Sequence, residues 1–208
     1  MAMMNKWVSF KIFLISIFFY LCLIPLWSIA QLDSAALSKE PEFISMDEAL
    51  KDPAKVYKLN LRKQKLKKFP KEIFTFTNLQ ELNLSRNKID QVPEEIGQLT
   101  KLQILDLSRN KLKAVPSQIG KLVRLRKLLL YLNEIPTLPA EIGNLTLLQT
   151  LDMWGNEISE FPPEISKLKS NLRYLDLRVI DIPQPLQDKI VLQLPMTTIY
   201  FSKSCNCR

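Results

Sequence analysis

The chain of 208 residues contains no histidine, only four glycines and only three cysteines. Without histidine, Ser-His-Asp and Cys-His catalytic groups are excluded, as is every metal site that needs an imidazole. The four glycines, at positions 97, 120, 143 and 155, cannot form a GxGxxG or GxxxxGK[ST] phosphate-binding loop. We therefore expect no enzyme, no catalytic residues, no bound metal and no cofactor.

Cysteine is also too scarce to build a disulfide framework. Cys22 lies in the apolar start of the chain, and Cys205 and Cys207 lie at its end. A Cys-x-Cys disulfide closes a very small, strained ring, so these two thiols could instead pair between chains or stay reduced. With 47% hydrophobic and 24% charged residues, packing alone must hold the domain together.

The first thirty residues have the pattern of an export signal. Lys6 and Lys11 are their only charges, Ile12–Ile24 is almost wholly apolar, and Ser28-Ile29-Ala30 places small residues before Gln31. This pattern predicts a secretory signal peptide over residues 1–30 and a secreted, periplasmic or cell-envelope protein. The alternative is a retained N-terminal membrane anchor, because the uncharged stretch is nearly long enough to span a bilayer. Removing two lysines changes the net charge from +8 to +6.

A repeat of 23 residues organises the centre of the chain. Prolines recur at Pro70, Pro93, Pro116, Pro139 and Pro162, and an isoleucine follows each of them three residues later. Each unit reads L-x-x-L-x-L-x-x-N-x-[LI], starting at Val56, Leu79, Leu102, Leu125, Leu148 and Leu172. Such a fixed period is the signature of a repeat architecture.

Over Val56–Ile182 these units resemble the leucine-rich repeat family, in its short form with an L-P-x-x-I-G-x-L-x-x-L spacer. The resemblance implies an α/β solenoid: an arc with a parallel β-sheet on its concave face and 3₁₀ helices, short helices or extended chain on its convex side. It also implies binding rather than catalysis, and it suggests an exported protein of a Gram-negative bacterium. Gln64, Met153 and Ile180 depart from the repeat, so the terminal units are less regular than the middle.

The same pattern assigns structural roles. In L-x-L the two leucines point to one side of a strand and the middle residue points to the other. At the end of each strand we predict an inward-turned asparagine ladder that satisfies backbone groups, formed by Asn87, Asn110, Asn133 and Asn156.

Both ends of the stack need covers. Residues 31–55 are predicted to hold a capping helix, because Ser45-Met46-Asp47-Glu48 is a capping box and the helix would run to about Lys51. Leu50 and Val56 would then shield the first strand. Residues 183–208 are predicted to form a C-terminal cap, a helix ended by Pro195 and a short strand at 198–201, followed by the Cys-x-Cys tail.

Two surfaces stand out on the predicted sheet face. The first, which we call the aromatic patch, comprises Leu129, Tyr131, Leu132 and Trp154. Large apolar side chains at exposed positions favour a protein partner, and the alternatives are cover by long neighbours or self-association. The second, the basic strip, comprises Arg62, Lys63, Arg86 and Arg109. It is a candidate site for anionic glycan, lipopolysaccharide phosphate or an acidic protein, or else an ordinary solvated face.

Asp152 and Asp176 occupy the same position of adjacent repeats, but we predict no closed cleft that would suit them to acid–base catalysis. The sequence thus predicts an exported, non-catalytic module that binds a protein through its concave face. A self-associating structural or adhesion component of the cell envelope is the alternative. Nucleic acid is not an expected partner, and a membrane is one only if the N-terminal segment is retained.

Overall fold

The structure is a computed structural model that describes residues 32–202. The predicted signal peptide and the thiols of Cys205 and Cys207 lie outside these residues. Residues 32–38 belong to a different unit from the rest of the described chain, and helix α2 (Ser34–Lys39) begins in it. The Asp33 carboxylate accepts a hydrogen bond from the Ala36 backbone N–H at 2.7 Å, which caps the first turn of this helix.

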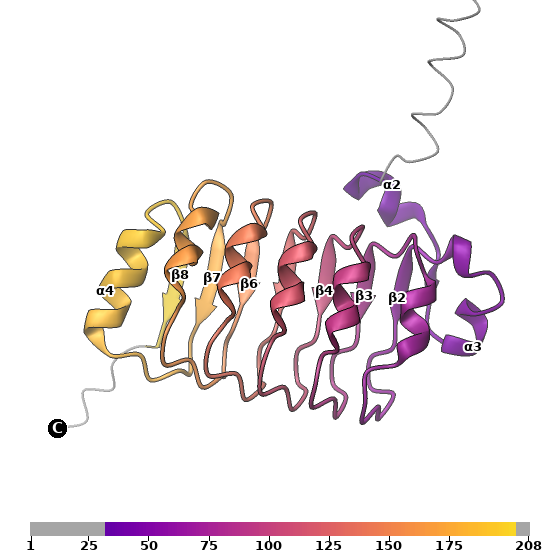
Figure 1. Ribbon diagram of the computed structural model, residues 1–208, viewed down its shortest axis with the longest axis horizontal. Helices are drawn as coiled ribbons and strands as arrows, with labels where there is room; N and C mark the ends of the chain where they lie inside the picture. The colour runs from indigo at the N-terminus through magenta and orange to yellow at the C-terminus, as the bar shows by residue number, and fades with distance from the viewer. Residues whose placement is uncertain (1–31, 203–208) are drawn as a thin grey trace, which may run out of the picture. The chain divides into compact units, whose positions relative to one another are not determined.

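From Lys39 onward the chain builds one parallel sheet of eight strands in sequence order (Figure 1). Its strands are β1 (Glu42–Phe43), β2 (Lys58–Asn60), β3 (Glu81–Asn83), β4 (Ile104–Asp106), β5 (Lys127–Leu129), β6 (Thr150–Asp152), β7 (Tyr174–Leu177) and β8 (Thr198–Phe201). Equivalent residues of successive repeats pair with one another, as Leu82, Leu105 and Leu128 do. The predicted leucine-rich solenoid is therefore confirmed, because one repeat makes one turn.

The spacers form a layer of 3₁₀ helices on the other side of the arc from the strands (Figure 1). They are η1 (Pro53–Lys55), η2 (Lys71–Thr75), η3 (Glu94–Gln98), η4 (Ser117–Lys121), η5 (Ala140–Asn144) and η6 (Pro163–Leu168). The spacer proline directly precedes each helix from η2 to η6, where its fixed φ sets the entry of the chain. The isoleucine three residues later points inward and is fully buried in each of these five helices.

Between the two layers the apolar side chains form one continuous core that runs through all the repeats. Within the spacer layer, η5 and η6 approach so closely that a Cβ atom on Gly143 would lie 2.5 Å from the backbone oxygen of Glu164 in the next turn. Glycine at this spacer position therefore allows neighbouring 3₁₀ helices to pack.

After each strand, the backbone turns through the left-handed region. The residue two positions after the second leucine of each L-x-L pair, where Met153 replaces leucine in one repeat, has a positive φ. These residues are Lys63, Arg86, Arg109, Leu132, Gly155 and Val179. In this turn Leu132 N–H donates to the Trp154 carbonyl at 2.7 Å, so the inter-turn ladder continues past the strand. These residues therefore occupy a turn at the edge of the sheet. The sequence analysis had placed four of them, Lys63, Arg86, Arg109 and Leu132, on the sheet face itself.

The asparagine of each central repeat directly follows the residue with positive φ, and its side-chain amide bonds to the backbone on the inner side of the turn. Asn133 donates from Nδ2 to the carbonyls of Leu107, at 3.1 Å, and Leu130, at 2.8 Å, and its Oδ1 accepts from Leu112 N–H at 3.0 Å. Asn87, Asn110 and Asn156 repeat this geometry one turn apart. Each amide thus ties its own turn to the preceding one through two hydrogen bonds.

The N-terminal cover differs in part from the expectation. Helix α3 (Met46–Ala49) ends two residues short of Lys51, and within the described chain Ser45 makes no side-chain capping bond. Leu50 is 39% exposed instead of shielding the first strand. Strand β1, which the sequence analysis did not predict, pairs with β2 and extends the sheet at this end.

At the C-terminal end, helix α4 (Gln184–Gln193) buries Ile190, and β8 pairs with β7. Within residues 32–202, no helix combines the length and the apolar composition that crossing a bilayer requires.

Candidate binding face

The sheet places three columns of side chains on its concave face. In the first two columns the register joins Ile104, Lys127, Thr150 and Tyr174, and then Asp106, Leu129, Asp152 and Asp176, on neighbouring strands. Adjacent members of a column lie about 4.8 Å apart because that is the spacing of paired strands. The third column follows two residues after the second and includes Ser108, Tyr131, Trp154 and Arg178. Residues far apart in sequence thus form one continuous surface.

The aromatic patch occupies the middle of this face. Leu129, Tyr131, Leu132 and Trp154 are all half-buried, where the sequence analysis had placed them at exposed positions. The Tyr131 and Trp154 rings lie with centroids 5.8 Å apart and planes tilted by 36°. Leu132 sits in the left-handed turn, where its Cδ2 lies 2.7 Å from the point that a Cβ on Gly155 would occupy. Partner contacts from this patch would therefore come from Leu129 and the two rings, with Leu132 packed beside them at the edge.

The basic strip divides into two parts. Arg62, Lys63 and Arg86 are exposed, and a shallow hollow of about 320 Å³ lies between Ile44, Asn60 and the first two of these cations. Arg109 is half-buried, and its guanidinium carbon lies 5.7 Å from the centroid of the Tyr131 ring. This cation–π contact attaches Arg109 to the aromatic patch, so the two predicted surfaces meet there.

Three carboxylates on the face, Asp106, Asp152 and Asp176, form what we call the acidic column. Each accepts a hydrogen bond through Oδ1 from the backbone N–H two residues later, at 3.0 to 3.1 Å. This local bond closes a small turn at the end of the strand, a common use of aspartate and asparagine side chains. The acidic column thus has a structural role as well as a charge.

The three carboxylates differ in what else they contact. Asp106 also accepts from the Ser108 hydroxyl at 2.5 Å, and Asp176 forms an ion pair with Arg178 at 2.6 Å. Burial is the main cause that raises the pKa of Asp152 above 3.8, and the charges of Asp176 and Asp106 raise it further. The Trp154 N–H and the charge of Arg178 act in the opposite direction.

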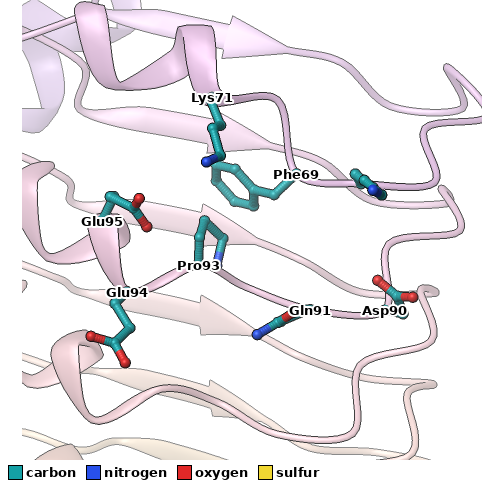
Figure 2. Close-up of a pocket in the computed structure, with 8 residues that line it drawn as sticks. Phe69, Lys71, Asp90, Gln91, Pro93, Glu94 and Glu95 are labelled. Atoms are coloured by element: carbon teal, nitrogen blue, oxygen red, sulfur yellow. The ribbon is translucent and has the colours of Figure 1, made fainter.

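The spacer side carries hollows that the sequence analysis did not anticipate. One of about 420 Å³ lies between the first two spacers, with Phe69 and Pro93 at its centre and Lys71 and Glu95 beside them (Figure 2). Phe69 is stacked on Phe74 with centroids 5.6 Å apart, so its ring is fixed by packing. The lining mixes both charges on an apolar floor, which favours an ordinary solvated groove over a reactive site.

A second hollow of about 470 Å³ lies between η3 and η4, beside Glu95, Gly97 and Lys121. The missing side chain of Gly97 is the one signal in the sequence that points to it. Within residues 32–202, no three histidine, cysteine, aspartate or glutamate side chains gather in a way that could hold a metal ion.

Comparisons with known proteins agree with this geometry. Two family models match the chain: one described as a leucine-rich repeat over residues 54–112, and one described as a leucine-rich repeat region over residues 116–194. No curated protein sequence matches it. Among solved structures, a leucine-rich repeat protein of Leptospira interrogans is 33% identical with a TM-score of 0.63, and the match covers 77% of this chain and 46% of that one.

A plant peptide hormone receptor, RGFR1, solved in complex with RGF2, is 34% identical with a TM-score of 0.58. That match covers 69% of this chain and 24% of the receptor chain. The chain therefore spans about half of the bacterial protein and about a quarter of the plant receptor.

Proposed function

The chain belongs to the leucine-rich repeat family, and from that premise we propose that it is an exported, non-catalytic module that binds a protein or peptide through the concave face of its sheet. Proteins of this family typically act as binding modules. The similar plant receptor was solved in complex with RGF2, which supports a protein or peptide as the kind of partner.

One observation carries the proposal. The third column of the sheet face changes from small polar residues, Ser85 and Ser108, to the aromatic pair Tyr131 and Trp154. The repeats can stack without any aromatic side chain on the solvent side of the sheet, because the apolar core that holds them together lies on the other side. Half-buried tyrosine and tryptophan on a concave surface are the residue types that anchor protein interfaces.

A pull-down from envelope and host extracts tests the proposal. Wild type is compared with the Tyr131→Ala/Trp154→Ala double variant, which removes the centre of the aromatic patch. The matched control is Val123→Ala/Leu147→Ala, which removes two exposed apolar side chains outside the strands. We expect the aromatic double variant to lose the partner and the control to retain it. Equal capture by all three proteins would contradict binding through this patch.

Export rests on the pattern of residues 1–30, which lie outside the described residues. We expect the exported chain to begin at Gln31, and N-terminal sequencing of protein recovered from the periplasm or medium measures this. Recovery of the intact N-terminus in the membrane fraction would instead indicate a retained anchor.

The basic strip supports an accessory role with anionic ligands such as lipopolysaccharide phosphate or anionic glycan. Such binding weakens as salt is added, because exposed charges are screened over about 8–10 Å at physiological ionic strength. An affinity for these ligands that is equal at low and high salt would discard the strip as their site.

A self-associating envelope component is the second candidate. Strand β8 is the last in the described sheet, and Leu192 in helix α4 and Met196 before β8 are 80% and 76% exposed. Light scattering with and without reductant distinguishes this candidate, since Cys205 or Cys207 could link two chains. A monomer under both conditions would count against it.

A further inference from the structure

The acidic column contains one carboxylate, that of Asp152, that has neither a cationic nor a hydroxyl side chain as its partner. Asp176 is held by Arg178, whose Nε and Nη2 atoms bond both carboxylate oxygens at 2.6 to 3.1 Å. Asp106 is held by the Ser108 hydroxyl. Asp152 has neither kind of partner: its Oδ1 accepts the Trp154 N–H, and among residues 32–202 no lysine or arginine lies within ion-pair distance.

The neighbouring turn shows what would complete this arrangement. There Arg178 pairs with the carboxylate of Asp176 while its guanidinium carbon lies 5.5 Å from the centroid of the Tyr200 ring. A carboxylate, an arginine and an aromatic ring thus form one unit on the sheet face. One turn earlier, Asp152 is equivalent to Asp176, and Trp154, two residues later, occupies the position of Arg178. Asp152 therefore has an aromatic ring in its own turn where Asp176 has an arginine.

The neighbouring side chains leave the Asp152 carboxylate available to a ligand. Tyr131 contacts the Trp154 ring on the side of β5, and Arg109 is already taken up by Tyr131. Arg178, whose charge acts on Asp152, is committed to Asp176 and Tyr200. The half-buried carboxylate beside a half-buried indole therefore offers a negative charge and an aromatic ring to a group that comes from outside the chain.

We propose that Asp152 and Trp154 together bind a cationic side chain, arginine or lysine, of the peptide or protein partner. This inference rests on the proposed function of the concave face and specifies the chemistry that the face selects. The cation would pair with the Asp152 carboxylate and lie against the Trp154 ring, as Arg178 does with Asp176 and Tyr200. Charge complementarity selects this partner over an acidic peptide, because three carboxylates line the column that the ligand would cross.

Asp152→Asn is a clean test because it removes the charge and keeps the local turn. Asn60 and Asn83, at the equivalent position of the first two repeats, make the same Oδ1 bond to the N–H two residues later, at 3.2 and 2.9 Å. Glu95→Gln is the matched control, since it removes one half-buried negative charge from helix η3 on the spacer side.

The experiment uses the full chain and a displayed library of random twelve-residue peptides. Selected peptides are resynthesised with a dye, and their affinities for wild type, Asp152→Asn, Trp154→Ala and Glu95→Gln are measured by fluorescence anisotropy. We expect the selected peptides to share an arginine or lysine whose replacement by glutamine weakens binding about tenfold. Asp152→Asn should weaken the parent peptide by a similar factor and leave the glutamine peptide unchanged, while Glu95→Gln changes neither.

The outcomes separate this inference from the function on which it rests. Peptides that depend on Trp154 but bind Asp152→Asn as well as wild type overturn the cation site and retain the binding face. Peptides that bind all four proteins equally, or a library that yields no binder, overturn both. A free polyamine that competes with the peptide for wild type but not for Asp152→Asn supports the site. A polyamine that binds as tightly as the peptide itself would contradict the proposal that the cation belongs to a peptide or protein partner.

Discussion

The asparagine ladder makes the sharpest stability prediction, at Asn133. Replacing Asn133 by leucine keeps nearly the same volume and removes three hydrogen bonds, to the Leu107 and Leu130 carbonyls and from the Leu112 N–H. Because the size is conserved, the change creates no cavity, and the measured effect reports on the polar contacts alone.

The three bonds do not count equally. The Leu107 carbonyl keeps a bond from the Asn110 amide at 2.9 Å, and the Leu130 carbonyl keeps one from Asn156 at 3.0 Å. The Leu112 N–H loses the acceptor that the structure gives it. One orphaned buried donor costs about 1–3 kcal/mol, and each lost additional bond costs about 0.5–1.5 kcal/mol. We therefore expect Asn133→Leu to lower the free energy of unfolding by about 2–6 kcal/mol, a large share of the 5–15 kcal/mol typical of a domain.

Urea unfolding followed by circular dichroism measures this loss. The matched control is Asn144→Leu, which makes the same replacement at an exposed amide and should change stability by less than about 0.5 kcal/mol. A loss below about 1 kcal/mol for Asn133→Leu, with an unchanged transition slope, would refute the idea that the ladder holds the turns together.

Three further changes test other features. Gly143→Ala should destabilise by about 1–3 kcal/mol, measured by thermal unfolding, because its Cβ would lie 2.5 Å from the Glu164 oxygen; an unchanged Tm would show that the spacers can separate freely. Val179→Asn should stabilise by about 0.5–1 kcal/mol in urea, since this exposed β-branched residue has a φ of 57°, and a loss of stability would contradict a strained turn. Asp152→Asn should raise stability at neutral pH: burial raises the folded pKa of Asp152, so its ionisation costs folding energy as pH rises through that value. The gain should shrink as pH falls toward the pKa of an ordinary carboxyl, and a gain that grows in acid would reverse the assigned cause.

The sequence was sufficient for the repeat architecture because the 23-residue period marks equivalent positions without any knowledge of distance. Proline, isoleucine and the strand leucines recur in register, and stacking such units buries one side and exposes the other. The same logic predicted that Leu129, Tyr131 and Trp154 would lie on one face. The left-handed turn at Arg86 and Arg109 was missed, since only Gly155 among its six residues carries the usual signal for positive φ.

Strand β1 illustrates the limit of local pattern. Its two residues, Glu42 and Phe43, show no alternation to read, and they become a strand only because β2 offers an unpaired edge. The stacking of Arg109 on Tyr131 and the pairing of Arg178 with Asp176 likewise depend on where neighbouring turns place their side chains.

The sequence by itself therefore determined the coil, its period, its core and the columns of its outer face, because these follow from periodicity alone. The tertiary structure decided which charges on that face are already satisfied. That outcome depends on distances between side chains, and it leaves Asp152 as the carboxylate of the acidic column with neither a cation nor a hydroxyl as its partner.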